Sequence, residues 1–286
     1  LALVGRLAGG PAQVAVVSSA LFGSINGSPI ANTATTGAFT IPLMKRVGFP
    51  PHIAAAVEAA ASTGGMILPP VMGAGAFIMA ELTRTPYAEI AKLSMIPGLL
   101  YFLGVGVMVY CEARKLKLRG LPPDEVPKLG PVLRGGWYLL VPLAVLVAVL
   151  LRTTSPSQAV IYSILACIAV SWLRKETRMG PREVWEALVE TGKSSTYVAA
   201  ASGAIGIVVG VVALTGIGVR FSQLVLDISR GSLPLALLLV AAASFILGMG
   251  MPITAAYLVL AVVAAPALER MGLYLLAAHL IIFWLS

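Results

Sequence analysis

The sequence predicts an all-α polytopic membrane protein that contains an inverted repeat with two re-entrant helical hairpins and broken helices. Three observations lead to this fold class. Hydrophobic residues make up 58% of the 286 residues and charged residues 11%, whereas soluble domains contain about 25% charged residues. Apolar runs of helix length recur along the whole chain. Two runs, residues 7–44 and 231–268, each contain 38 residues without a charge.

Composition also excludes several functional classes. A mean hydropathy of +0.93 excludes a disordered chain, which needs low hydrophobicity and high charge. The net charge of +8 comes from Lys and Arg in loops between apolar runs. That pattern is typical of the cytoplasmic face of a membrane protein and not of a nucleic-acid surface. The sequence has no zinc-protease, phosphate-loop or nucleophile-elbow motif, so we do not expect an enzyme.

The first element, residues 7–44, is expected to fold back as a hairpin, because one straight membrane helix needs only about 20 residues. Its turn is the run Gly-Ser-Ile-Asn-Gly-Ser-Pro from Gly23 to Pro29. Residues 231–268 are expected to form a second hairpin around a Gly-Met-Gly-Met-Pro run. Gly and Pro positions of the two hairpins match at offsets of 223 and 224 residues, which indicates an internal repeat.

The other elements follow in order. A broken helix is predicted at 50–80, since glycines and prolines interrupt its apolar sequence. Further apolar segments are predicted as helices, at 88–111, 135–151, 157–173, 194–216 and 273–286. The segment 273–286 follows the second hairpin, and the broken helix at 50–80 counts as one span, so five crossings separate the two hairpins. The second hairpin therefore enters the membrane from the opposite side, as in secondary transporters with inverted repeats.

This order divides the chain into a first repeat, a linker, a scaffold section and a second repeat, at residues 1–111, 112–134, 135–193 and 194–286. Segment 181–192 alternates charged and apolar residues at helical spacing, so we expect a helix along the membrane interface. On this topology 14 Lys and Arg residues lie on one side and 6 on the other. The side with 14, which includes the linker, is expected to be cytoplasmic.

The first turn is the strongest candidate for a binding site, because broken helices persist at membrane depth only where something satisfies their backbone groups. Side-chain oxygens gather there and on the following arm, at Ser24, Asn26, Ser28, Asn32 and Thr33. Such oxygens and freed carbonyls suit a small cation, and the amides that begin the second arm suit a carboxylate. For Thr35 and Thr36 we favour hydrogen bonds between helices.

Gly64 and Gly65, in the break of residues 50–80, are expected to form the opposite wall of this site. The second turn is less polar, and an ion there would depend on backbone carbonyls. Glu58 is the one acidic residue deep in an apolar segment, and an ionisable side chain within the membrane is a functional candidate. Three alternatives stay open for it. It carries a proton, it stays protonated against a backbone carbonyl, or it reaches the interface about two turns away.

Four runs together resemble the large membrane subunit of TRAP (tripartite ATP-independent periplasmic) transporters: Phe22 to Asn32, Ile41 to Lys45, Gly64 to Ala74, and Gly248 to Tyr257. The resemblance is strongest to the fused type associated with TAXI-class solute-binding proteins. It implies an elevator-type subunit in the bacterial inner membrane that imports a small organic acid (a carboxylate) with sodium as the coupling ion. Its implied partners are an extracytoplasmic solute-binding protein and a small membrane subunit.

The resemblance also implies site residues. Sodium would be held by the two hairpin turns and the first break, at Ser24, Asn26, Ser28, Gly64, Gly65, Gly248, Gly250 and Thr254. Substrate would contact Ser28, Asn32, Thr33 and Thr254. We expect a fragment, because the break after the second hairpin should fall near residue 288. The alternatives are an ion or solute channel, for which Glu58 is the one candidate pore charge, and a membrane scaffold without transport activity.

Overall fold

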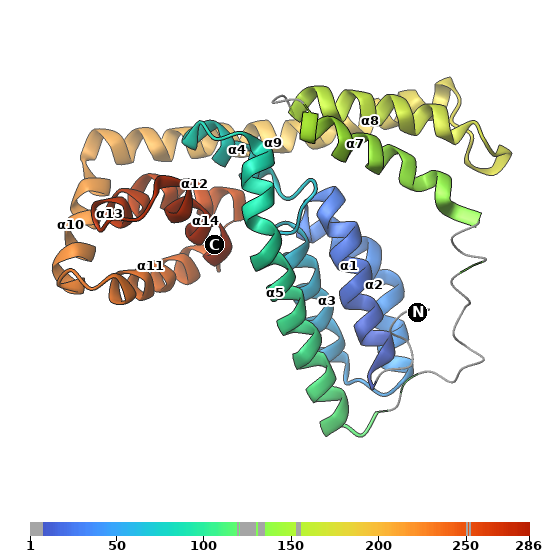
Figure 1. Cartoon of the computed structure of the whole chain (residues 1–286), viewed down its shortest axis with the longest axis horizontal. Helices are drawn as coiled ribbons and strands as arrows, with labels where there is room; N and C mark the ends of the chain where they lie inside the picture. Colours follow the sequence, from blue (N-terminus) through green and yellow to red (C-terminus); the bar gives the residue numbers. More distant parts are fainter. Residues whose placement is uncertain are drawn as a thin grey trace. The chain divides into compact units, whose positions relative to one another are not determined.

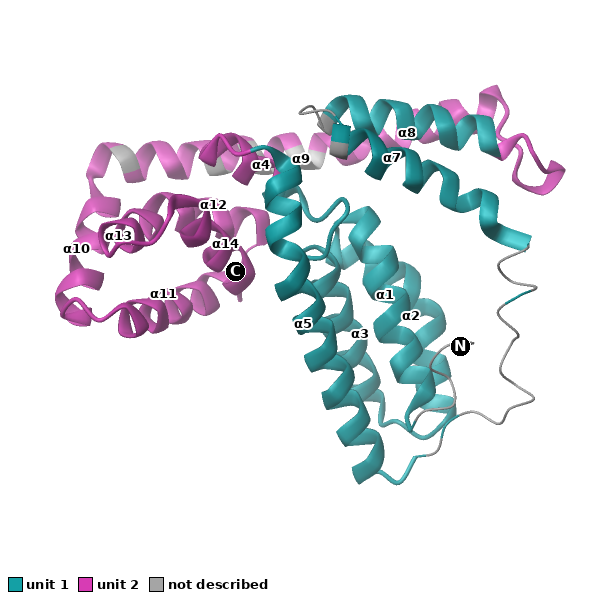
Figure 2. Ribbon diagram, viewed as in Figure 1, with its two compact units in different colours: residues 1–76, 86–170 teal, residues 77–85, 171–286 magenta. Residues whose placement is uncertain are grey.

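The computed structural model of the chain describes residues 8–118, 120, 130, 135–152, 156–249, 251 and 253–286. Within these ranges the chain forms α-helices, two short 3-10 helices and no strand (Figure 1). The predicted all-α fold class is therefore confirmed. The helices divide into two compact units, residues 1–76 with 86–170 and residues 77–85 with 171–286 (Figure 2).

The first unit is built on a hairpin of α1 (Gly10–Asn26) and α2 (Pro29–Arg46), with α3 (Pro51–Gly65) and α5 (Tyr87–Lys115) packed beside it (Figure 1). Alanines dominate the buried contact between these helices, at positions 12, 15, 54, 61 and 113. Small side chains let helix backbones approach closely, which is how membrane helices gain packing energy. This close packing places polar groups of three helices within reach of one another.

A non-helical break covers residues 66–73 and follows directly on α3. Pro69 and Pro70 lie within it, and neither can donate a backbone hydrogen bond to a helix. The chain then forms α4 (Ala74–Thr83), whose residues cross the boundary between the two units. The first unit ends with η2 (Trp137–Leu140), α7 (Val141–Arg152) and α8 (Pro156–Ser171).

The second unit is also helical, and its elements differ from the prediction at two places. Its elements are η3 (Lys175–Thr177), α9 (Pro181–Thr215), α10 (Ile217–Ser229), α11 (Leu233–Gly248), α12 (Ile253–Val263), α13 (Ala265–Arg270) and α14 (Leu275–Leu285). The helix α9 runs through residue 193, where the prediction separates an interfacial helix from the next span. Gly192 is the one helix-weakening residue at that point, and no proline accompanies it.

The helix α10 was not predicted, because Arg220 and Asp227 interrupt its apolar residues. Its buried residues are Ser222, Val225 and Ser229, which share one face at helical spacing. The helical spacing of these buried residues indicates the helix, whereas the positions of the charged residues alone suggested a loop.

The internal repeat is visible in the backbone. The helix α2 covers residues 29–46, and α12 with α13 covers 253–270, which is 224 residues later at both ends. The same turn follows α2 and α13. In it, the amide of a glycine (Gly48 or Gly272) donates to the carbonyl three residues back, and the next amide (Phe49 or Leu273) donates to the carbonyl five residues back. The φ angles of the two glycines are also similar, at 107° and 93°.

Among the described helices, α5 alone is long and apolar enough to cross a membrane by itself. Residues 206–212 of α9 qualify together with α10, across a bend of 66°. Six other apolar helices have between 10 and 17 residues.

Candidate functional site

The turn between α1 and α2 is held against the break that follows α3. The carbonyl of Ser24, in the last turn of α1, accepts hydrogen bonds from the amides of Val71 (2.9 Å) and Met72 (3.3 Å). The break therefore supplies donors to a carbonyl near the end of α1. The predicted opposition of the first turn and the first break is present as a main-chain contact.

Two glycines allow this contact. A Cβ atom on Gly65 would lie 2.5 Å from the Cα of Gly23, and one on Gly23 would lie 2.7 Å from the Cα of Gly65. Both neighbours are backbone atoms, which cannot move aside as a flexible side chain can. The ends of α1 and α3 thus meet at a point where any side chain would force them apart.

Asn26 and Ser28 form the rim of the turn. The Oδ1 atom of Asn26 accepts a hydrogen bond from the amide of Ser28 at 2.7 Å, and the Oγ of Ser28 accepts one from the amide of Ala31 at 3.3 Å. Ser28 is thus the N-cap of α2. An amide or hydroxyl oxygen has two lone pairs, so each keeps one for a further ligand. These hard oxygens fit the chemistry of a sodium ion.

The other predicted residues of this site have different surroundings. Ser24 is buried, and its hydroxyl donates to the carbonyl of Leu21 at 3.0 Å. Asn32 is fully buried and donates from Nδ2 to the carbonyl of Ser19 at 3.0 Å. That bond ties α2 to α1 inside the hairpin. Thr33 lies half-buried in the first turns of α2.

The predicted residues of the second turn lie in the second unit. Gly248 ends α11, and a Cβ on it would lie 2.7 Å from the carbonyl oxygen of Ser286. Thr254 belongs to the first turn of α12. Gly250 lies outside the described residues, so the structure places it nowhere.

Glu58 is the centre of a polar cluster that sequence reasoning found only in part. Its side chain is 0% exposed, so it does not reach the interface, and that alternative was wrong. Four hydroxyl groups contact its carboxyl group, from Ser19 of α1, Thr36 and Thr40 of α2, and Ser62 of α3. Three helices of the first unit therefore converge on one acidic side chain.

Ser19, Thr40 and Ser62 were missed at the sequence level. Thr36 was expected to bond between helices, and it does, through Glu58. A usable signal existed, because Thr36 and Thr40, like Glu58 and Ser62, are spaced four residues apart. That spacing places two polar side chains on one face of a helix.

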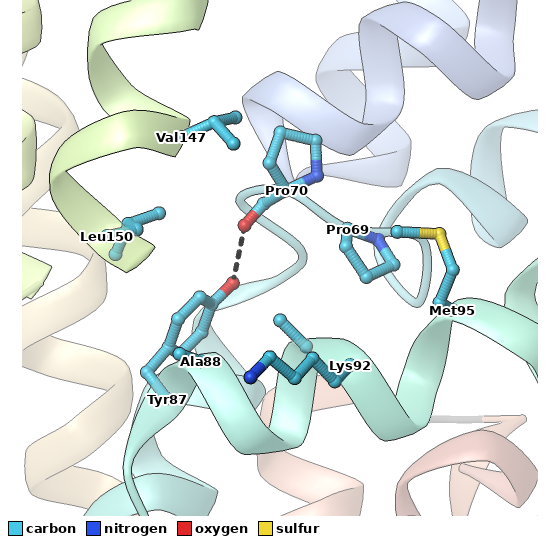
Figure 3. Close-up of a pocket in the computed structure, with 9 residues that line it drawn as sticks. Pro69, Pro70, Tyr87, Ala88, Lys92, Met95, Val147 and Leu150 are labelled. Carbon is cyan, nitrogen blue, oxygen red and sulfur yellow. Dashed lines mark hydrogen bonds between the residues drawn. The ribbon is translucent and has the colours of Figure 1, made fainter. Parts of the chain in front are cut away.

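An apolar pocket lies on another side of the break (Figure 3). It is lined by residues of the break, α5 and α7: Pro69, Pro70, Tyr87, Ala88, Ala91, Lys92, Met95, Val147 and Leu150. The hydroxyl of Tyr87 lies 3.0 Å from the carbonyl oxygen of Pro70 and also contacts that of Val71, which anchors the break to α5 (Figure 3). Lys92 is the one charged residue of the lining. Because apolar groups dominate its lining, this pocket is distinct from the turn between α1 and α2, where the oxygens of Asn26 and Ser28 lie.

The second unit has a smaller buried polar contact. Tyr257 of α12 and His279 of α14 share a hydrogen bond of 2.8 Å between Oη and Nδ1. Phe283 packs edge-on against Tyr257, with ring centroids 5.5 Å apart. The described residues of this unit place no acidic side chain at this contact.

Comparison with known proteins gives the family. The family model described as "Tripartite ATP-independent periplasmic transporter, DctM component" matches residues 1–286. The C4-dicarboxylate TRAP transporter large permease protein of Pseudomonas aeruginosa is 28% identical over 194 residues, which are 67% of this chain and 44% of that protein. The isethionate TRAP transporter permease protein of Oleidesulfovibrio alaskensis is 25% identical over 276 residues, 94% of this chain and 42% of that protein.

The 2,3-diketo-L-gulonate TRAP transporter large permease protein of Escherichia coli is 23% identical over 279 residues, 95% of this chain and 63% of that protein. The chain thus spans about half the length of the curated relatives it matches. The names of these relatives describe permeases and not enzymes. With a family match that covers every residue, this chain belongs to the DctM component family of tripartite ATP-independent periplasmic transporters.

Proposed function

We propose that this chain is the transporting part of a sodium-coupled importer of a small organic acid in the bacterial inner membrane, which it crosses several times. The observation that carries the proposal is the oxygen-rich turn between α1 and α2, seated on the break that follows α3. Two helix ends and a break meet there without an intervening side chain. Such helix interruptions are how secondary transporters build ion and substrate sites.

The sodium site of this proposal uses Asn26 and Ser28 with backbone groups around Ser24, Gly64 and Gly65. Each of the two side chains has an oxygen lone pair left after its local hydrogen bond. Sodium is a hard cation, like calcium, and takes oxygen ligands. The second turn, with Gly248, Gly250 and Thr254, is proposed as a second sodium site, and no cofactor besides sodium is proposed.

The substrate site of this proposal lies at the start of α2, beside the ion. The first amides of a helix and its positive dipole end favour an anion, and Ser28, Asn32 and Thr33 belong to that end of α2. Thr254 lies in the first turn of α12 and is proposed as a substrate contact of the second unit. One relative is named for a C4-dicarboxylate and another for 2,3-diketo-L-gulonate, which supports a small organic acid as the substrate class.

The proposed partners are an extracytoplasmic solute-binding protein of the TAXI class, a small membrane subunit and the surrounding lipid. The name of the isethionate relative joins M and Q in one permease protein, DctMQ. We carry the fused arrangement over from that relative and from the resemblance of the turn sequences. Nucleic acid is not among the proposed partners.

Uptake into proteoliposomes tests the proposal. The assembled transporter, with its purified solute-binding protein outside, is given a labelled C4-dicarboxylate, isethionate or 2,3-diketo-L-gulonate. We expect uptake of one of them that needs both an inward sodium gradient and the binding protein. Asn26→Ala and Ser28→Ala should raise the sodium concentration for half-maximal uptake about tenfold, equivalent to roughly 1.4 kcal/mol per ligand. Unchanged sodium activation in both variants would falsify the first-turn site.

Ser232→Ala is the matched control. Like Ser28 before α2, Ser232 directly precedes a helix, α11, that has a proline in its first turn. Unlike Ser28, Ser232 makes no side-chain cap hydrogen bond. It lies at the start of the second hairpin and not at its turn. Sodium activation of this variant should equal that of the wild type.

A further inference from the structure

Glu58 belongs to neither the proposed sodium site nor the proposed substrate site, yet it is the most completely enclosed acidic group among the described residues of the first unit. Its two carboxyl oxygens have different neighbours. Oε1 lies 2.8 Å from the hydroxyl of Ser19, 2.5 Å from that of Thr36 and 3.2 Å from that of Ser62. Oε2 contacts the hydroxyl of Thr40.

Counting hydrogens separates the roles of the two oxygens. A threonine hydroxyl has one hydrogen, and a backbone carbonyl can only accept. Thr40 Oγ1 lies 3.0 Å from the carbonyl oxygen of Thr36 and also contacts Oε2 of Glu58. When its hydrogen goes to the carbonyl, as is common for threonine in a helix, the contact with Oε2 needs a hydrogen on the carboxyl group.

Thr36 has the same restriction. Its Oγ1 lies 2.8 Å from the carbonyl oxygen of Asn32 and 2.5 Å from Oε1 of Glu58. Ser19 and Ser62 contact the same oxygen, Oε1, and can donate to it. Oε1 thus has two hydroxyl donors besides Thr36, whereas Thr40 is the one hydroxyl that contacts Oε2 among the described residues. A proton on the carboxyl group is therefore best accommodated on Oε2, where it can be donated to Thr40.

Cationic groups do not balance a charge on Glu58 in the described part of the chain. The helices packed against α3 are α1, α2 and α5, and α1 contains no ionisable side chain. The ionisable residues of the other helices are Lys45, Arg46, His52, Tyr87, Glu89, Lys92, Tyr101, Tyr110, Cys111, Glu112, Arg114 and Lys115. Lys45, Arg46 and His52 are exposed near helix ends, and Tyr101 donates to the carbonyl of Ala60 at 2.8 Å.

A buried carboxylate without a cation is strongly disfavoured, and a proton is the smallest group that neutralises it. From these contacts we propose that Glu58 is a proton-binding site of the transport cycle, with the proton on Oε2 while α1, α2 and α3 are closed on one another. This proposal deepens the proposed function and rests on it for the coupling to transport. It adds a proton to the ions that the carrier moves.

The proton balance is simple. On release, the proton passes from Oε2 to water, and the carboxyl group becomes a carboxylate with one negative charge. The single hydrogen of Thr40 then turns from the carbonyl of Thr36 toward Oε2. Because Thr36 and Thr40 belong to α2 and Glu58 to α3, separation of these helices admits water and permits the release. Movement of the hairpin and loss of the proton are thereby linked.

Infrared difference spectroscopy tests the proton directly and needs no substrate. Spectra of the assembled transporter in lipid are recorded between acidic and alkaline buffers, with choline in place of sodium. We expect one carbonyl-stretch band of a protonated carboxyl group that is absent in Glu58→Gln and shifted in Thr40→Val. Glu89→Gln, at an exposed position of α5, should keep that band. A band that persists unchanged in Glu58→Gln would overturn the proposal.

A transport assay tests the coupling. With equal sodium on both sides, an inward proton gradient should drive uptake of the labelled organic acid at least tenfold better in the wild type than in Glu58→Gln. A sodium gradient should still drive uptake in that variant, which shows that it is folded and functional. Equal responses of both proteins to the proton gradient would contradict the proposal. If no acid is taken up under any gradient, the proposed function fails, and the infrared band decides on Glu58 alone.

Discussion

The two repeats share the turn that follows their hairpin and differ in what packs beside it. After α2 and after α13 the chain makes the same turn, with hydrogen bonds at the same spacing and glycines at φ angles of 107° and 93°. Where α3 packs against the first hairpin, four hydroxyl groups of α1, α2 and α3 surround Glu58. Where α14 packs against α12 of the second unit, Tyr257 contacts His279 and Phe283. Repetition has preserved the turns, whereas the chemistry between the helices has diverged.

That difference indicates a division of labour. This turn has a glycine with a positive φ in both repeats, so the backbone is constrained in the same way at both places. The interior of a helix pair is constrained only by volume and by satisfied polar groups. The first unit can therefore hold an ionisable cluster around Glu58, whereas the second holds the contact of Tyr257 with His279. Matched substitutions in the two units measure whether ion binding depends on the first unit alone.

The largest effect is expected at the glycine contact of the first hairpin. Gly65→Ala places a Cβ 2.5 Å from the Cα of Gly23, so the turn of the hairpin must move off the break. Such overpacking against backbone costs about 3 kcal/mol. Unfolding of the purified protein by SDS in mixed micelles measures this loss of free energy.

Gly104→Ala is the control for this substitution. Gly104 lies in α5, and a Cβ there would meet no atom within 4 Å. Alanine in an exposed helix is more stable than glycine by roughly 0.5–1 kcal/mol. Equal stability of the two variants would show that the contact of Gly23 with Gly65 does not hold the hairpin closed.

A smaller effect, about 2 kcal/mol, is expected for Ser19→Ala, because a buried polar group that loses its partner costs about 1–3 kcal/mol. Ser18→Ala is its neighbour on α1, and Ser18 donates only to the carbonyl of Ala15, at 3.1 Å in the described structure. That variant should stay within about 0.5 kcal/mol of the wild type. The same SDS titration compares them, and a loss of similar size in both would argue that the cluster around Glu58 adds nothing to the closed hairpin.

The position of the first hairpin could be predicted from the sequence, but the polar contacts between its helices and α3 could be predicted only in part. Charge-free runs, Gly-rich turns and the Pro69–Pro70 break are local signals, and they located the first hairpin and its break. Asn26 and Ser28 were found because they interrupt an apolar run. Ser19, Thr40 and Ser62 were missed because single hydroxyls are ordinary in membrane helices. What distinguishes them is the packing of three helices around Glu58, which no local pattern contains.

The helix α10 shows the same limit from the other direction. Arg220 and Asp227 suggested a loop, whereas the buried face of Ser222, Val225 and Ser229 stabilises a helix. Ser222 also donates to the carbonyl of Val263, 3.1 Å away, near the end of α12. Tertiary contacts of this kind override local charge.

In the second hairpin, Tyr257→Phe is expected to cost about 1.5 kcal/mol, since it leaves the ring nitrogen of buried His279 without the tyrosine hydroxyl. A double-mutant cycle with His279→Phe gives the coupling energy of the pair. The cycle should show a coupling near 1 kcal/mol. Sodium activation of uptake should stay that of the wild type if the charge chemistry belongs to the first unit. A large change in sodium activation would place this pair in ion binding and remove the proposed division of labour.

The smallest effect is expected where the two repeats are most alike. Gly48→Ala and Gly272→Ala each force a residue with a side chain into a positive φ, which costs about 1 kcal/mol. A Cβ on Gly48 would lie 2.9 Å from Cδ2 of Leu118, whereas one on Gly272 would meet no atom within 4 Å. The end of a leucine side chain can move, so the first variant should lose only a few tenths of a kcal/mol more than the second. SDS unfolding of both variants beside Gly210→Ala, which changes a helical glycine in open space, separates the cost of the turn from the general effect of alanine. Losses that differ by more than about 1 kcal/mol would mean that the repeats share the path of the backbone but not its energetics.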